Sequence, residues 1–149
     1  MSDPVITQID IDAPPEAVWT VVMDTERLGE WVSIHRGLGD YSTGPAAVGS
    51  TMEQSLALRG AKFKVKWKLV RCEDAKVAEW HGKGPARSKA ETEYRLEAID
   101  GGTRFHYRNE FKAPLGPLGA VASKALVGGL PEKEAHASLN ALKALVEKG

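Results

Sequence analysis

The sequence IDAPPEAVW at residues 11–19, followed by LGEW at residues 28–31, does most to decide the fold. Two prolines end a strand that starts near Val5. The second of them, Pro15, suits a first helical turn because its missing N–H would have no partner there. Apolar residues then recur at spacings of three and four, as in a short amphipathic helix. We expect a strand, that helix, and a second short helix that delivers Trp31 to the core.

Three later segments alternate with the period of two that a half-buried strand requires. At residues 63–69 every odd position is apolar and every even position is lysine, and residues 86–98 and 103–111 repeat an alternation of inward and charged positions. Gly101-Gly102 predicts a tight turn, and Arg59-Gly60 predicts another hairpin. Neighbouring strands should therefore be antiparallel.

Residues 77–82 leave two orientations open. Either Trp80 faces the core, or Val77, Glu79 and His81 do. We favour the first, because an aromatic ring gains more from burial than Val77 does. The choice decides whether Glu79 and His81 form a surface ion pair or an inward acid–base pair.

A long helix is expected after the sheet, from the Pro-Leu-Gly-rich residues 114–119 to about Glu147. Pro131 should kink or break it, because proline removes a backbone donor and crowds the carbonyl four residues earlier. Its predicted core-facing positions form two stripes: Leu118, Val121, Ala122, Ala125, Leu126 and Gly129, then Ala135, Leu139, Leu142 and Val146.

Composition places the chain among ordinary soluble globular proteins, and 149 residues predict a single domain spanning residues 1–149. Acidic and basic residues balance at 20 each, which argues against nucleic-acid binding driven by net charge. A single cysteine, Cys72, suits a reducing compartment, and neither a signal peptide nor a membrane-spanning run is evident. We expect a cytoplasmic monomer or homodimer without stable membrane insertion.

The opening at residues 11–31, on a chain of this length with a long C-terminal helix, resembles the START/polyketide cyclase-like (SRPBCC) superfamily. The resemblance implies an α+β helix-grip fold. In that fold a curved antiparallel sheet of six to seven strands wraps around a long C-terminal helix, with two short helices after the first strand. Residues 30–35, 66–71 and 114–119 resemble an actinobacterial branch in which some members are named toxins of toxin–antitoxin pairs.

The resemblance also implies an apolar cavity between sheet and helix, and the residues support it independently. Many inward positions have polar tips, and a sealed core rarely tolerates many of these because each unpaired one costs about 1–3 kcal/mol. From the pattern alone, a filled core in which these groups pair with one another is an equal alternative. We expect a hydrophobic small molecule, such as a lipid, polyketide or aromatic metabolite, to be bound by eight residues: Met52, Phe63, Trp67, Trp80, Tyr94, Tyr107, Asn109 and Leu126.

Two alternatives stay open. A cyclase- or dehydratase-type enzyme would use His81 or Glu79 with Tyr107 for proton transfer. A toxin or regulatory protein would act through a protein surface instead. No catalytic motif is shared across the superfamily, so the resemblance assigns no catalytic residue.

Metal, cofactor and nucleotide sites are not predicted. The sequence has no Cys pair, no His-x-x-x-His, no Glu-x-x-His on a helix, and no phosphate loop followed by Lys-Ser/Thr. Lys62, Lys64, Lys66 and Lys68 form a basic ribbon along one strand. We interpret it as a solvated face that is protected against edge pairing, and Glu91, Glu93 and Glu97 on another strand could face it electrostatically.

Overall fold

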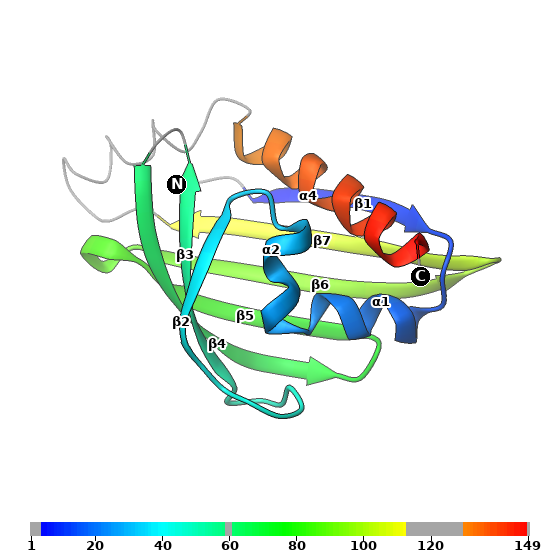
Figure 1. The fold of residues 1–149 in the computed structure, drawn as a ribbon, viewed down its shortest axis with the longest axis horizontal. Coiled ribbons are helices and arrows are strands. Elements are labelled where there is room, and N and C mark those ends of the chain that lie inside the picture. Colours follow the sequence, from blue (N-terminus) through cyan, green and yellow to red (C-terminus); the bar gives the residue numbers. More distant parts are fainter. Residues whose placement is uncertain (1–3, 59–60, 113–129, 149) are drawn as a thin grey trace.

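A curved antiparallel sheet forms one layer of the molecule, and helices cover its concave face (Figure 1). The computed structural model describes residues 4–58, 61–112 and 130–148. The strands within these ranges are β1 (Val5–Ile11), β2 (His35–Tyr41), β3 (Thr51–Leu58), β4 (Ala61–Glu73), β5 (Val77–Lys83), β6 (Lys89–Ile99) and β7 (Gly102–Lys112). The helices are α1 (Pro15–Val22), α2 (Leu28–Trp31), α4 (Leu130–Glu147) and the 3-10 turns η1 (Thr25–Arg27) and η2 (Pro85–Arg87).

The strand order is β1-β7-β6-β5-β4-β3-β2, and every neighbouring pair is antiparallel. Strands β2 to β7 follow one another as hairpins, whereas β1 pairs with β7, which comes much later in the chain. Helix α4 packs against β1 and α2. The α+β fold with seven strands confirms the predicted architecture.

The segment that follows β1 folds as its sequence predicts. Helix α1 starts with Pro15 at its first position. The Asp24 carboxylate caps η1 by accepting a hydrogen bond from the backbone N–H of Glu26 at 3.1 Å. Helix α2 then buries Leu28 and Trp31, whose exposed fractions are 3% and 2%. The expected second helix with an aromatic at its end is confirmed.

Strand β5 settles the orientation of residues 77–82. Trp80 faces the core with 5% of its surface exposed, and the His81 side chain faces solvent. Strand β4 likewise buries Val65, Trp67 and Leu69 at its odd positions. The inward choice for Trp80 is confirmed, and Glu79 lies with His81 on the outer face.

The predicted strand start at residue 86 is wrong. Residues 85–87 form the 3-10 turn η2, and β6 begins at Lys89. Arg87 has a φ of 66°, which is left-handed and incompatible with an extended strand. The alternation of small and charged residues therefore extends past the strand into the turn that precedes it.

Helix α4 buries Ala135, Leu139, Leu142 and Val146, which confirms the second predicted stripe. The first stripe, from Leu118 to Gly129, lies outside the described residues, so the kink predicted at Pro131 stays a prediction. No helix in the described ranges combines the length and apolarity that crossing a membrane requires.

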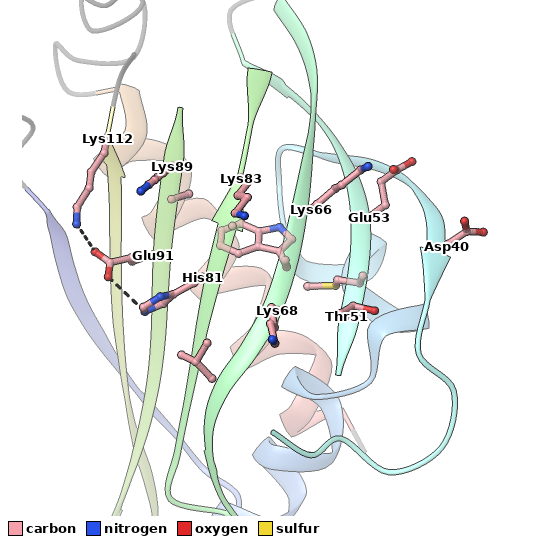
Figure 2. A pocket seen from close by; sticks show the side chains of 15 residues that line it. Asp40, Thr51, Glu53, Lys66, Lys68, His81, Lys83, Lys89, Glu91 and Lys112 are labelled. Atoms are coloured by element: carbon pink, nitrogen blue, oxygen red, sulfur yellow. Dashed lines mark ion pairs between the residues drawn. The ribbon is translucent and has the colours of Figure 1, made fainter. Parts of the chain in front are cut away.

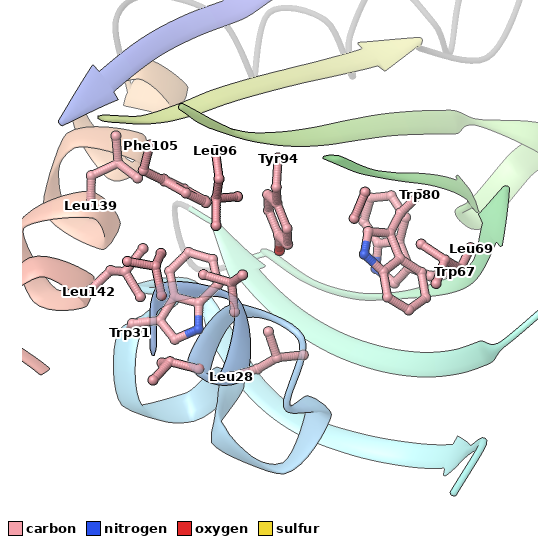
Figure 3. Close-up of a cluster of buried hydrophobic side chains, with 14 of the residues drawn as sticks. Leu28, Trp31, Trp67, Leu69, Trp80, Tyr94, Leu96, Phe105, Leu139 and Leu142 are labelled. Atoms are coloured by element: carbon pink, nitrogen blue, oxygen red, sulfur yellow. The ribbon is translucent and has the colours of Figure 1, made fainter. Parts of the chain in front are cut away.

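The core is aromatic at its centre (Figure 3). The ring of Trp31 meets those of Tyr94 and Phe105 edge-on, at centroid distances of 5.8 and 6.5 Å. Tyr94 and Phe105 are 5.5 Å apart. These distances fall in the favourable range for aromatic pairs, so α2 is fixed to β6 and β7 by ring contacts.

The interpretation of the lysine ribbon on β4 as edge protection is wrong for Lys66 and Lys68, because both have a paired strand on each side, β3 and β5. Lys62 and Lys64 pair with β3, and β5 ends before it reaches them. Strand β5 also separates β4 from Glu91 on β6, which therefore does not lie next to the ribbon.

Candidate functional site: a cavity between the sheet and the helices

A cavity lies between the concave face of the sheet and the helical layer. It encloses about 60 Å³ that the centre of a water molecule can occupy. Its wall comes from α2 and the residues after it, from strands β3 to β7, and from α4. The lining residues are Leu28, Trp31, Val32, Ile34, Met52, Gln54, Leu56, Trp67, Trp80, Thr92, Tyr94, Tyr107, Asn109 and Ser138.

A chain of hydrogen bonds leads from the cavity wall toward the rim. The Trp67 indole Nε1–H donates to Gln54 Oε1 at 2.9 Å, and Gln54 Nε2 lies 2.9 Å from His35 Nδ1. Since an indole can only donate, the Gln54 amide must donate to His35, whose proton is then on Nε2. Burial, followed by the nearby Arg36, lowers the pKa of His35, which favours this neutral form.

Gly82 makes room for Trp67. The two residues are directly opposite on β5 and β4. A Cβ at position 82 would lie 2.5 Å from Val65 Cγ1 and 2.7 Å from Trp67 Cε3. A real Cβ does not approach other atoms so closely, so glycine allows the indole to lie across the strand and reach Gln54.

Two tyrosines and a hydrogen-bonded pair form the opposite wall. Thr92 Oγ1 donates to Asn109 Oδ1 at 3.1 Å, across β6 and β7. Tyr94 and Tyr107 stack beside them with centroids 6.0 Å apart. Burial raises the pKa of Tyr107 to about 12 and that of Tyr94 higher still, with Tyr107 adding to the effect on Tyr94. Both phenols are therefore neutral hydrogen-bonding groups at ordinary pH, and neither has a partner in the described part of the chain.

The Trp31 indole contributes an unpaired donor. Its Nε1 is the one buried side-chain nitrogen or oxygen of the described residues that lacks a hydrogen-bond partner. Leaving such a donor unpaired costs about 1–3 kcal/mol. Trp31 is one of the residues that line the cavity, so this unpaired donor belongs to a residue of its wall.

Helix α4 closes the cavity through serine contacts. Ser138 Oγ accepts a hydrogen bond from the backbone N–H of Ser33 at 2.9 Å. The Ser33 hydroxyl donates to the Glu134 carboxylate. These bonds join α4 to the segment after α2, so the helical side of the cavity is held by polar contacts as well as apolar packing.

Six of the eight predicted ligand-binding residues meet in this cavity: Met52, Trp67, Trp80, Tyr94, Tyr107 and Asn109. Phe63 packs against the core but does not line the cavity, and Leu126 lies outside the described residues. Sequence reasoning missed Gln54 and Ser138. The alternation of Gln54 with Met52 and Leu56 on β3 was the signal that could have identified the first.

The candidate acid–base residues are not brought together. Glu79 and His81 face solvent on β5, whereas Tyr107 lines the cavity on the other face of the sheet. His81 Nε2 lies 3.4 Å from Glu79 Oε1 and 3.2 Å from Glu91 Oε1. These three side chains could offer ligands to a metal ion, although the sequence predicts none. Lys112, however, already pairs with Glu91 at 2.9 Å.

Comparison with known proteins agrees with this geometry. A START superfamily protein from Mycobacterium smegmatis superposes with a TM-score of 0.76 and 15% identity, covering 97% of both chains. The Zhui aromatase/cyclase from a Streptomyces species (strain R1128) superposes with a TM-score of 0.81 and 15% identity, covering 99% of this chain and 95% of the other. Such likenesses show a START-like fold.

Sequence comparison identifies curated relatives and a family. The chain is 25% identical over 126 residues to Toxin Rv0910 of Mycobacterium tuberculosis, covering 83% of this chain and 88% of that protein. The profile of the family described as polyketide cyclase/dehydrase and lipid transport matches residues 5–147. The chain therefore belongs to the polyketide cyclase/dehydrase and lipid transport family.

Proposed function

We propose that this protein binds a hydrophobic small molecule in the cavity between the sheet and the helices. The observation that carries the proposal is the convergence of polar tips on one apolar space. Gln54, Thr92, Asn109 and the two tyrosines line it from three strands of the sheet, β3, β6 and β7. An apolar pocket with a few convergent polar groups is the usual form of a small-molecule site.

The lining predicts the chemistry of the ligand. Trp67, Trp80 and Tyr94 offer ring faces and edges for an aromatic or cyclic group. The Tyr94 and Tyr107 hydroxyls and the Trp31 N–H offer donors for carbonyl or hydroxyl oxygens. We therefore favour an oxygenated cyclic or aromatic compound over a plain hydrocarbon chain. The family description, which includes polyketide cyclase and lipid transport, supports the same class.

Ligand size requires a change of shape. The space of about 60 Å³ equals about two water molecules, since each takes about 30 Å³ in the liquid. Sites for drug-sized ligands measure about 300–1,000 Å³. A polyketide-sized ligand would therefore bind only if the helices move away from the sheet or the aromatic side chains rotate.

The test begins with native mass spectrometry of freshly purified protein, which should reveal an adduct of one small molecule. A thermal-shift screen of hydroxylated aromatics, polyketides and fatty acids follows. A ligand at a hundred times its Kd should add about 2.7 kcal/mol to the stability. Isothermal titration should then give one site per chain.

A double variant locates the site. Thr92→Val with Asn109→Leu replaces the hydrogen-bonded pair by apolar groups of similar shape, a change that can be nearly neutral for folding. It should weaken an oxygenated ligand about tenfold, and Tyr41→Phe, outside the cavity, should leave affinity unchanged. Equal affinity in the double variant, or no adduct and no shift with any compound, would refute the proposal.

A further inference from the structure

The outer face of the sheet carries a row of four lysines on neighbouring strands (Figure 2). Lys66 on β4 is directly opposite Lys83 on β5, Lys83 is opposite Lys89 on β6, and Lys89 is opposite Lys112 on β7. All four side chains are exposed. We call these residues the lysine row. Like charges directly opposite each other on a sheet are destabilising, so the row needs an explanation.

The next two rows on the same face mix their charges. Two residues further along, the row is Lys68, His81, Glu91 and Glu110, and after it come Arg71, Glu79, Glu93 and Arg108. In these rows each basic group has an acidic group either on the adjacent strand or on the strand after it. Of the three rows, the lysine row is the one in which all four strands contribute a positive charge.

Neighbouring carboxylates neutralise little of this charge. Lys112 pairs with Glu91 at 2.9 Å. Glu53 is opposite Lys66, but it forms its ion pair with Lys64, at 3.9 Å. Within the described ranges, Lys66, Lys83 and Lys89 form no ion pair. Edge protection does not explain these three either, because each of them is opposite a residue on both neighbouring strands.

The row crosses a hollow of about 730 Å³ on the outer face. This volume lies within the range of small-molecule sites. The charged side chains that line it are Lys66, Lys68, Lys83, Lys89, Lys112 and His81, against Asp40, Glu53 and Glu91. Figure 2 shows the lysines arrayed across neighbouring strands with the acidic groups at the two sides. The hollow is thus basic along its length in a chain whose net charge is zero.

We propose that this hollow binds a small anion that carries several phosphate groups. Strands lie about 4.8 Å apart, so the row presents a positive charge at each strand over a span of about 14 Å. A chain of linked phosphates can meet several of these lysines at once, whereas a single carboxylate meets one. Lysine ammonium groups serve phosphate as point charges with rotatable donors.

Nucleic acid is the less favourable occupant. Single-stranded nucleic acid needs exposed aromatic rings on which bases stack. Of the lining residues in the hollow, Trp67 is the aromatic one, and only 7% of its surface is exposed. The hollow and the interior cavity share Met52 and Trp67 in their walls, but no lysine among the described residues lines the interior cavity. Variants of the lysine row therefore test this proposal separately from the proposed function.

The test is isothermal titration of the full chain with sodium tripolyphosphate at low ionic strength, with sodium sulfate as the comparison anion. The expected result is saturable binding at one site, which sulfate does not reproduce at equal ionic strength. Lys83→Gln should weaken binding about tenfold, as expected for losing one hydrogen bond to a charged group. The triple variant Lys66→Gln, Lys83→Gln, Lys89→Gln should abolish binding and raise the Tm of the free protein.

A second triple variant controls for net charge. Lys62→Gln, Lys76→Gln and Lys133→Gln remove the same charge from exposed positions outside the hollow, and should leave binding within about twofold. Three results would each overturn the proposal. They are no saturable binding by the natural chain, equal loss in the two triple variants, or tighter binding of a short oligothymidylate than of tripolyphosphate.

Discussion

The two faces of the sheet treat their polar groups in opposite ways. On the inner face, Trp67, Gln54 and His35 satisfy one another in a chain, and Thr92 pairs with Asn109. On the outer face, the lysine row leaves like charges opposite each other. Burial makes an unpaired group costly, whereas water screens exposed charges. Unpaired groups on the two faces therefore carry different information. Inside, an unpaired donor identifies a group with which a ligand acceptor could pair; outside, a run of one sign identifies a surface suited to an ion of the opposite charge.

The largest difference between the two faces should be in the free energy of unfolding that is lost when a side chain is truncated. Phe105→Ala removes a ring with 0% exposure and should lower the free energy of unfolding by about 3–5 kcal/mol. Val70→Ala on the outer face, where 37% of the side chain is exposed, should change it by at most about 0.5 kcal/mol. Urea denaturation measures both. Similar losses would mean that the inner face is not the core.

Hydrogen bonding on the inner face should give the next largest effect. Gln54→Leu leaves the buried Trp67 N–H without its acceptor and should cost about 1–3 kcal/mol. Ser55→Ala, its neighbour on β3, should cost less than about 0.5 kcal/mol. Chemical denaturation with tryptophan fluorescence reports both variants. A Gln54→Leu protein as stable as the natural chain would show that the bond chain contributes nothing.

On the outer face, removing a charged group should stabilise the protein rather than destabilise it. Lys83→Gln removes the charge that is flanked by lysines on both sides, and should stabilise the ligand-free protein by about 0.2–1 kcal/mol. Lys68→Gln, in the mixed row, should give no such gain. Measuring Tm at low and high salt separates the cases, because added salt should erase the gain. Destabilisation by Lys83→Gln at low salt would contradict the repulsion.

The smallest effect concerns pH. Burial lowers the pKa of His35 in the folded protein, so the unfolded chain binds a proton more readily. The resulting stability is present above the ordinary histidine pKa of about 6.5 and is lost as pH falls below it. His35→Asn should therefore flatten the decline in Tm between neutral pH and pH 5. NMR titration of the His35 ring gives the pKa directly, and a value above the ordinary one would be inconsistent with the structure.

Sequence reasoning could predict the fold because its signals are local. The prolines before α1, the period of two on β4, and the stripe on α4 each depend on a few neighbouring residues. The predicted start of β6 at residue 86 was wrong, because an alternating pattern does not distinguish a strand from the turn at Arg87 that precedes it.

The site was predictable only in part. The alternation of inward and outward positions identified six lining residues. Gln54 is polar, and its place in the wall became clear only from its hydrogen bond with Trp67. The lysine row could not be seen in the sequence, because its four members come from four strands and only the register between strands aligns them. Edge protection also failed for Lys66 and Lys68 of the ribbon on β4, because which strands lie beside a residue depends on the topology of the whole sheet.

The pairing of β1 with β7 has a consequence for synthesis on the ribosome. Val5 is opposite Asn109, so β1 waits for about 100 further residues before its partner strand exists, which takes about 5–20 s at ordinary translation rates. During that interval the sheet lacks an edge, and α4, which packs on β1, has not yet been made. Folding should therefore be completed only once β7 and α4 have been made, and a nascent chain held before β7 should expose β1 to chaperones.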